Sequence, residues 1–290
     1  MNHLRTFKTE HQLRDDADLE IARVAINALY NCHKAVSDAI KAEKPNKEKD
    51  VFLNLAYGNI IWRTFEQAVG MLASLVTFCA PSAEALARVV IESSVNLMYI
   101  SQKGLESPLI GYFDRWLSEH KQKLSQWRDI DKDEEGFDFA LPMIDARIAW
   151  LESLQKWFDT VVSEHRLQRM PFQDSWPRSL FKRFQGVGEE DGYLTSYHRL
   201  STSSHLGPED TLSWLRGYAQ QDHDLLERMG VEAVSYSIMM SRVALVYYID
   251  GLVAFCRAKL FAVPLPLLEQ HKRELMTAIF EIAADAGCPE

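Results

Sequence analysis

The chain has 290 residues, a formal net charge of −9 and a pI near 5.5, which exclude a broad basic face for duplex nucleic acid. Hydrophobic residues make up 47% and charged residues 25%, as in ordinary globular proteins. The 7 Trp, 14 Phe and 10 Tyr can fill a sizeable core. Any contact with RNA would therefore be local or built from two subunits.

The cysteines and the N-terminus indicate a cytoplasmic protein. The cysteines lie far apart, without a C-x-x-C pair or a histidine at zinc-finger spacing, so we expect reduced thiols at Cys32, Cys79, Cys256 and Cys288. The N-terminus lacks the apolar h-region of a signal peptide. The apolar runs 69–80 and 243–256 are too short or too interrupted to span a bilayer, and we expect them to be buried core helices.

Helical periodicity dominates the chain, and prolines and glycines mark its interruptions. The spacing predicts helices over residues 10–42, 49–79, 82–101, 108–128, 142–166, 174–186, 191–204, 209–219, 232–260 and 267–284. We find neither the alternation typical of strands nor a repeat of fixed period. The sequence therefore predicts an all-α fold, a multi-helix bundle of about nine helices.

Residues 129–140 are expected to form an exposed loop, because this segment is acidic and lacks a periodic apolar face. Such a loop could divide two subdomains. The helices before it, however, cannot bury their apolar faces without the helices after it. We therefore expect one all-helical domain over residues 1–290.

Motifs for cofactors and metals are missing from the sequence. There is no G-x-G-x-x-G or G-x-x-x-x-G-K-[ST] loop for phosphates and no H-E-x-x-H zinc motif. The Glu-x-x-His repeats of di-iron bundles are missing too. We therefore expect no cofactor and no metal.

The predicted helix 82–101 is apolar nearly all round and should be buried. Along one edge of it, Arg88, Glu92 and Asn96 recur at four-residue spacing. A carboxylate in such surroundings must be paired, hydrogen-bonded or protonated. Arg88 can pair with Glu92 within the same helix. These residues form one half of a candidate site.

The segment 193–208 supplies the other half of the candidate site. Four of its polar side chains line one stripe at four-residue spacing, namely Tyr193, Tyr197, Ser201 and His205. Arg199 lies off this stripe, about 120° and ~9 Å from His205 on an unbroken helix. The two converge only if the helix ends near residues 203–204, which Gly207 and Pro208 permit, or if they come from different subunits.

The combination of R-x-x-x-E in an apolar helix with a later Y-x-x-x-S-x-x-x-H resembles a bacterial family of helical proteins catalogued as a domain of unknown function. The resemblance covers residues 56–205. Arg199 and His205, with five residues between them, also match the R-x4–6-H motif of the HEPN superfamily, many of whose members are metal-independent ribonucleases in toxin–antitoxin, CRISPR-associated and anti-phage systems. Leu200 stands where that motif often has a polar residue. The resemblance implies a HEPN-like core, an RNA substrate and a homodimer.

The same resemblance implies a role for each residue of the site. His205 acts on the ribose 2′-OH as general base or on the leaving oxygen as general acid. Arg199 stabilises the charge on the in-line phosphorane, and Glu92 orients Arg199. The remaining residues contact the substrate or hold the imidazole, namely Arg88, Asn96, Tyr193, Tyr197 and Ser201.

Each of these residues also has a structural interpretation. Glu92 and Arg88 can form an ion pair that only fixes the core, and His205 can interact with the dipole at a helix C-terminus. Tyr193 and Tyr197 can be core aromatics with one hydrogen bond each. The sequence therefore leaves three functions open, which are a ribonuclease, a non-catalytic helical interaction module, and a small-molecule or nucleotide sensor.

Overall fold

The computed structural model describes residues 3–44, 47–129, 137–171, 175–203 and 208–285. Within these ranges the chain forms helices and loops and no strand, which confirms the all-α class. The chain divides into two compact units. The first comprises residues 1–44, 54–102 and 180–290, and the second comprises residues 45–53 and 103–179. The expectation of a single domain stays a prediction.

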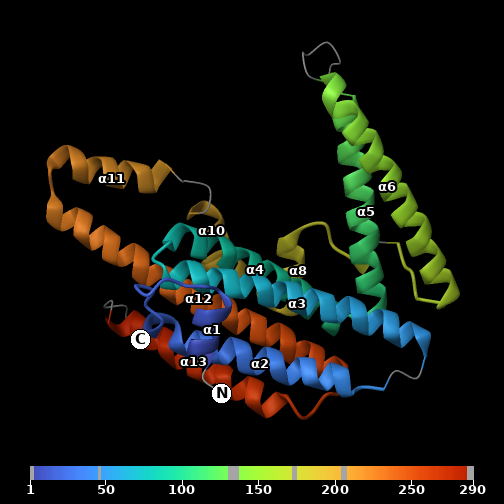
Figure 1. Cartoon of the computed structure of the whole chain (residues 1–290), viewed down its shortest axis with the longest axis horizontal. Coiled ribbons are helices and arrows are strands. Elements are labelled where there is room, and N and C mark those ends of the chain that lie inside the picture. The colour runs from blue at the N-terminus through green and yellow to red at the C-terminus, as the bar shows by residue number, and fades with distance from the viewer. Residues whose placement is uncertain (1–2, 45–46, 130–136, 172–174, 204–207, 286–290) are drawn as a thin grey trace. The chain divides into compact units, whose positions relative to one another are not determined.

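The first unit contains the long helices of the bundle and the candidate site. Its elements are α1 (His3–Glu10), η1 (Glu20–Ala22), α2 (Arg23–Ala42), most of α3 (Glu48–Val76), α4 (Ala80–Gln102), α8 (Leu180–Val187), α9 (Glu190–Gly192), η2 (Tyr193–Tyr197), α10 (His198–Ser203), α11 (Pro208–Gln220), α12 (His223–Ala258) and α13 (Leu265–Asp285). Figure 1 labels the larger of these along the chain.

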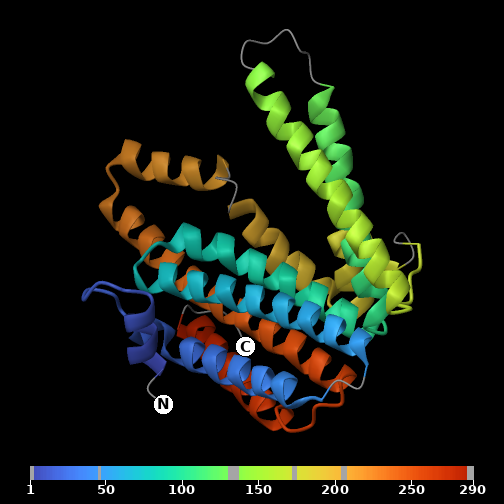
Figure 2. The ribbon, with the colours of Figure 1, turned by 45° about the vertical axis from the view of Figure 1, so that its right-hand side comes forward.

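The helix α12 is the centre of the first unit. It contacts α4, α13 and α2, and Figures 1 and 2 show it between α3 and α4 on one side and α2 and α13 on the other. Gly251 permits the close approach to α4, because a Cβ atom there would lie 3.3 Å from the carbonyl oxygen of Ser94. By length and composition α12 could cross a bilayer, but 61% of its most apolar window is buried within the fold. Such burial is typical of the core helix of a soluble protein.

The helix α4 is buried, as its sequence predicts. Its fully or nearly fully buried side chains include Ala83, Ala87, Val90, Ile91, Val95, Leu97 and Ile100. Val89 is the exception to the predicted apolar surface, since 41% of it is exposed. The polar edge of Arg88, Glu92 and Asn96 is half-buried, so α4 presents it at a margin of the core.

The second unit is built on a hairpin of two antiparallel helices, α5 (Glu106–Arg128) and α6 (Phe137–Glu164). Its core contains residues of both helices and of the segment that follows them, namely Ile110, Leu117, Leu151, Phe158, Val161, Val162 and Leu167. These apolar side chains recur at helical spacing on the facing sides of α5 and α6, which explains why the two helices pair.

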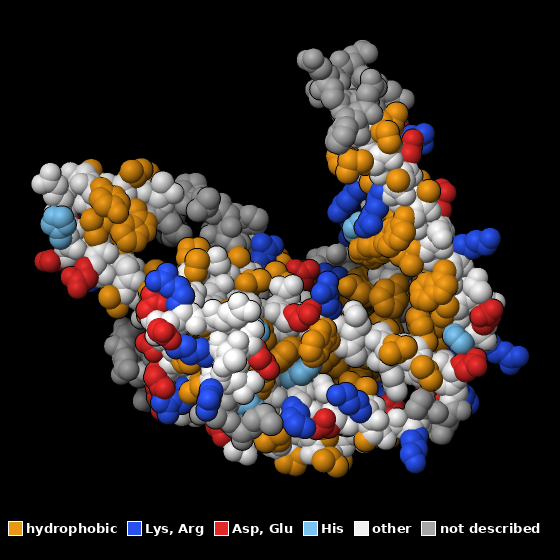
Figure 3. Space-filling view, viewed as in Figure 1, with side chains coloured by type: hydrophobic (Ala, Val, Ile, Leu, Met, Phe, Trp, Pro, Cys, Tyr) orange, Lys and Arg blue, Asp and Glu red, His pale blue; other side chains and the backbone are white. Residues whose placement is uncertain are grey.

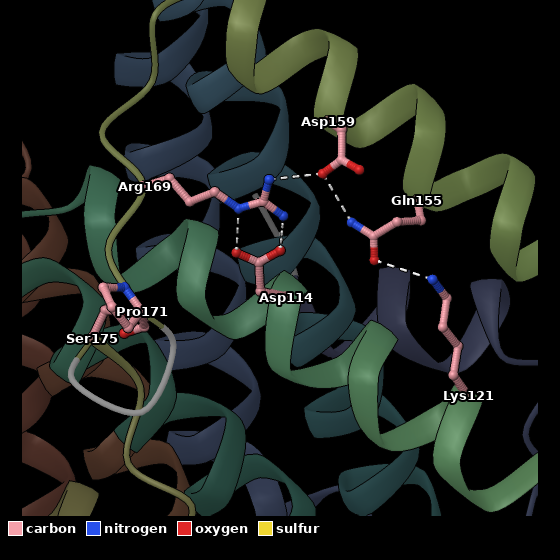
Figure 4. Close-up of polar contacts among 7 residues, drawn as sticks. All are labelled: Asp114, Lys121, Gln155, Asp159, Arg169, Pro171 and Ser175. Atoms are coloured by element: carbon pink, nitrogen blue, oxygen red, sulfur yellow. Dashed lines mark hydrogen bonds and ion pairs between the residues drawn. The ribbon is translucent and has the colours of Figure 1, made fainter.

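Arg169, in the segment after α6, ties the hairpin together (Figure 4). Its guanidinium forms a bidentate ion pair with Asp114 of α5, with Nε 2.8 Å from Oδ2. It also donates to Asp159 of α6, with Nη1 2.7 Å from Oδ1. Gln155 donates to the same carboxylate and accepts from Lys121. Hydrogen bonding to Asp114 raises the pKa of Arg169, so the Arg169 guanidinium stays charged.

The helix predicted over residues 10–42 ends at Ala42 as expected but begins much later. The helix α1 ends at Glu10 and α2 begins at Arg23, with the short turn η1 before it. Gln12 breaks the helix, because its φ of 49° lies in the left-handed region. The Asp18 carboxylate then accepts a hydrogen bond from the backbone N–H of Glu20 at 3.0 Å. This side-chain contact favours a turn over a continuous helix.

Two helices begin five or more residues earlier than predicted. The helix α6 starts at Phe137, so Pro142 lies inside it and not in its first turn. It therefore includes part of the segment 129–140 that we expected to be a loop, of which residues 130–136 lie outside the described part of the chain. The helix α12 starts at His223, well before residue 232, because the Asp222 side chain caps it by accepting from the Leu225 N–H at 2.9 Å.

Candidate functional site

A hydrogen bond joins the two halves of the candidate site. Tyr197, at the end of η2, donates from Oη to Oε2 of Glu92 on α4 over 3.1 Å. The two residues are 105 positions apart in the sequence, and the helices that carry them pack together in the first unit. The structure therefore brings together the R-x-x-x-E edge and the tyrosine stripe, as their pairing in the sequence predicts.

Arg88 lies against the same tyrosine. Its Cζ atom is 5.1 Å from the centroid of the Tyr197 ring, within range of a cation–π interaction. Burial raises the pKa of the Tyr197 hydroxyl, the Glu92 carboxylate raises it further, and Arg88 opposes the shift. Tyr197 is therefore protonated at neutral pH and acts as the donor. The structure gives Glu92 a hydrogen-bond partner that the sequence did not suggest for it, the Tyr197 hydroxyl.

An aromatic cluster positions Tyr197. Its ring stacks on Tyr193 with centroids 5.4 Å apart, and Phe184 of α8 contacts both rings. The turn between the two tyrosines is a π-helix, Tyr193–Tyr197. Such turns are rare and occur often at functional sites, where they turn side chains out of the regular helical phase. Tyr193 thus supports Tyr197, whose side chain is only 6% exposed.

Arg199 has a different environment from Arg88. It is exposed on α10, and its Cζ atom lies 4.6 Å from the centroid of the Tyr236 ring of α12. Burial raises the pKa of Tyr236 to about 12, against the opposing effect of Arg199. Within the described part of the chain, the buried Tyr236 hydroxyl has no hydrogen-bond partner. The site therefore contains an exposed guanidinium on the face of a tyrosine ring.

Glu84 and Ser237 belong to the same region and were missed from the sequence. Glu84 is 9% exposed, and Ser237 Oγ donates to its Oε1 over 2.6 Å. Glu84 lies four residues before Arg88, so the spacing of the polar edge continues one turn towards the N-terminus. That continuation was the available signal for Glu84. Ser237 carried none, since a single serine on a long apolar helix is unremarkable.

The structure describes the remaining predicted residues to different extents. Asn96 lies on the same edge of α4, and among the described residues its buried Oδ1 has no partner. Ser201 belongs to α10, but its side chain lies outside the part of the chain that the structure describes. His205 falls within residues 204–207, which lie outside the described part of the chain. Its predicted role stays a prediction.

The chemistry available at this cluster is that of anion binding and hydrogen bonding. Two guanidinium groups, the half-buried Arg88 and the exposed Arg199, can contact phosphate oxygens. The Tyr197 side chain, the Tyr236 hydroxyl and the Asn96 Oδ1 atom are buried. Glu92, already engaged by Tyr197, can orient a neighbouring donor. In the described residues, no group of three His, Cys, Asp or Glu side chains is arranged to hold a metal ion.

The comparison with known families covers this region. Residues 60–220, more than half of the chain, match the Family of unknown function (DUF5677). The chain belongs to this family. The DUF5677 match runs from α3 to the end of α11 and contains every residue of the predicted site, which confirms the resemblance to a domain of unknown function. Neither a curated protein nor a solved structure matches the chain.

Proposed function

We propose that this DUF5677 protein is a HEPN-like, metal-independent endoribonuclease of the bacterial cytoplasm, acting as a homodimer in toxin or anti-phage defence. The observation that supports this proposal is the hydrogen bond from Tyr197 to Glu92. It brings the Arg88 edge of α4 against the helical segment that carries Arg199 and leads to His205. A ribonuclease needs cations for the phosphate and a titratable group beside them. Arg88 and Arg199 are the cations of the proposed site, and His205 is its proposed titratable group.

In the proposed reaction, His205 removes the proton from a ribose 2′-OH, or protonates the leaving 5′-oxygen. The 2′-oxygen attacks the adjacent phosphorus, the bond to the 5′-oxygen breaks, and the products are a 2′,3′-cyclic phosphate and a 5′-hydroxyl. Arg199 stabilises the charge that develops on the phosphorane. Arg88 holds the phosphate. Tyr197, which donates its O–H to Glu92, positions the Arg88 guanidinium that lies over its ring.

The test uses the purified full-length chain with synthetic RNA and a chelator of divalent cations. The wild type should leave 2′,3′-cyclic phosphate ends. His205→Ala should reduce cleavage by at least about 100-fold, as expected for a general acid or base, without a change in melting temperature. His223→Ala is the matched control, since His223 is an exposed histidine at the start of α12, and it should cleave like wild type.

The second candidate is a non-catalytic helical interaction module. It is favoured by the same hydrogen bond, because a Glu92 carboxylate satisfied by Tyr197 can serve only to fix α4 against η2. In that case wild-type protein leaves RNA intact under all conditions, and Glu92→Ala lowers stability without any other loss. Wild-type rates of cleavage by His205→Ala would remove the ribonuclease proposal. A sensor of small molecules stays a prediction for the same cluster.

A further inference from the structure

The hairpin of α5 and α6 exposes four large apolar side chains, three of which form a row along α6. Exposed fractions are 52% for Trp127, 64% for Met143, 45% for Trp150 and 54% for Trp157. Figure 3 shows hydrophobic side chains gathered along this hairpin, with basic side chains among them. Single exposed apolar residues are common on soluble proteins, but a row of this kind marks an interaction surface.

The row follows a seven-residue period along α6. Met143, Trp150 and Trp157 are exposed at this spacing. One position further on, Ile144, Leu151 and Phe158 repeat the period and are buried, the last two in the core that α6 shares with α5. Since each residue turns a helix by about 100°, α6 carries two neighbouring apolar seams. A helix with two seams packs against two neighbours. In the second unit α5 packs on the buried seam, whereas the exposed seam has edge contacts, with Trp116 6.3 Å from Trp150 and Phe52 6.5 Å from Trp157 between ring centroids.

Small residues alternate with the large ones on the exposed seam. Ala146, Ser153 and Thr160 each follow a large residue by three positions, and all three are exposed. Large side chains at one seam position and small ones at the other permit two helices to approach closely. The shape of the surface therefore fits another α-helix.

The seam has nearly the same pattern in both directions from Trp150. Seven residues before it is Met143, and seven after it is Trp157. A two-fold axis at Trp150 would place two antiparallel copies of α6 with Met143 of each against Trp157 of the partner subunit. Such self-complementarity is the requirement for an isologous contact between identical chains. We propose that the α5–α6 hairpin binds the hairpin of a second copy of this chain and forms a four-helix bundle.

The charge of the hairpin favours a second copy of this chain over nucleic acid as its binding partner. The two helices together contain six Lys and Arg residues against eight Asp and Glu residues. The one cation on the seam, Arg147, lies over the Trp150 ring at 4.0 Å, where its aliphatic stem extends the apolar surface. A net acidic hairpin repels phosphates, whereas a seam of apolar side chains with a single arginine suits a second apolar helix.

The exposed area is of the right order for a dimer. Large aromatic side chains bury about 150–250 Å² each. Four large side chains exposed by roughly half supply on the order of 400 Å² per copy, about half of the ~800 Å² that each partner contributes to a standard interface. The small residues, Arg147 and the flanking surface of α5 supply the rest. This inference does not depend on the proposed ribonuclease activity.

Light scattering on the full chain after size exclusion tests the proposal. The wild type should be a dimer, and Trp150→Glu should weaken the dimer by at least roughly 30-fold, as for a central tryptophan of an interface. Phe280→Glu is the matched control, because Phe280 is a 64% exposed aromatic on α13, outside the hairpin, and it should remain dimeric. Circular dichroism of each variant establishes that the helices are intact.

A disulfide experiment tests the geometry. In a background with Cys79 and Cys288 replaced by serine, Trp150→Cys should crosslink two chains, because the same residue of both copies meets at the axis. Lys156→Cys, on another face of α6, should not. A monomeric wild type, or a dimer that Trp150→Glu and Trp157→Glu leave unchanged, would overturn the proposal. Loss of RNA binding by a Trp150→Glu variant that remains dimeric would assign the surface to nucleic acid instead.

Discussion

Tyr197 Oη donates to Glu92 Oε2 at 3.1 Å, while the Arg88 guanidinium lies over the Tyr197 ring. One tyrosine thus contacts both charged residues of the R-x-x-x-E edge. This relationship gives Glu92 a partner whether or not the site is catalytic. Variants that remove the hydroxyl, the ring or the carboxylate separately can therefore distinguish stability from activity.

Tyr197→Phe should lower the free energy of unfolding by about 1–2 kcal/mol, because Glu92 loses its donor while the aromatic packing is kept. Tyr197→Ala should cost more, about 3 kcal/mol or above, because a buried ring is removed as well. Urea denaturation followed by circular dichroism measures both. Tyr193→Phe is the control and should stay within about 0.5 kcal/mol of wild type. Equal stability of Tyr197→Phe and wild type would show that the hydrogen bond contributes nothing.

Ser237→Ala should destabilise the protein by about 1–3 kcal/mol, because the buried Glu84 carboxylate loses the hydroxyl that donates to it at 2.6 Å. Ser94→Ala is the matched control. Ser94 is equally buried, but its hydroxyl donates to the carbonyl oxygen of Val90 within α4. After the substitution this carbonyl oxygen keeps its backbone hydrogen bond in the helix. Urea denaturation should therefore show a clearly larger loss for Ser237→Ala than for Ser94→Ala, and equal losses would contradict the assigned role of Glu84.

Gly192→Ala should disturb the turn that precedes Tyr193. A Cβ atom at this position would overlap the hydroxyl of Tyr247 on α12, so one of the two must move, at a cost of about 1–3 kcal/mol. Tyr247→Phe removes the overlapping oxygen. The double variant should therefore lose less than the two single losses combined, which a double-mutant cycle of thermal or urea unfolding measures. Simple additivity of the two substitutions would show that this close approach does not constrain the turn.

His33 should make stability depend on pH. Its Nδ1 shares a hydrogen bond of 2.9 Å with the buried Tyr248 hydroxyl, and burial, with a smaller effect of Lys41, lowers its pKa to about 4 from 6.5. As pH falls, the unfolded chain takes up this proton before the folded chain does. Up to about 3 kcal/mol of stability is therefore lost between pH 6.5 and 4, with no further loss from this group below pH 4.

Urea denaturation at several pH values from 4 to 7 measures this effect in wild type and in His33→Gln. The free energy of unfolding of the variant should depend less steeply on pH in this window, because the variant lacks the His33 imidazole. The carboxylates that titrate near pH 4 are common to both proteins and do not contribute to the difference. An exposed histidine gives the matched control, and His223→Gln should retain the wild-type slope. Identical slopes for wild type and His33→Gln would exclude a lowered pKa at His33.

The sequence by itself determined most of the helices and the relations within each of them. Helical periodicity placed α4 within two residues of its observed ends, and four-residue spacing put Arg88, Glu92 and Asn96 on one edge. These features are local, because the rise and turn of an α-helix fix which residues share a face. Two of the misplaced helix starts, those of α2 and α12, have local causes as well, since the side chains of Asp18 and Asp222 accept hydrogen bonds from backbone groups, which the apolar pattern does not indicate.

Only the tertiary structure decided which residues meet across helices. Glu92 receives its hydrogen bond from Tyr197, Glu84 from Ser237, and Arg199 lies over Tyr236. Each partner comes from a segment more than a hundred residues away or from a long helix with many similar positions. Spacing along a chain does not say how two helices are rotated against each other, because that rotation is set by the packing of all their side chains at once.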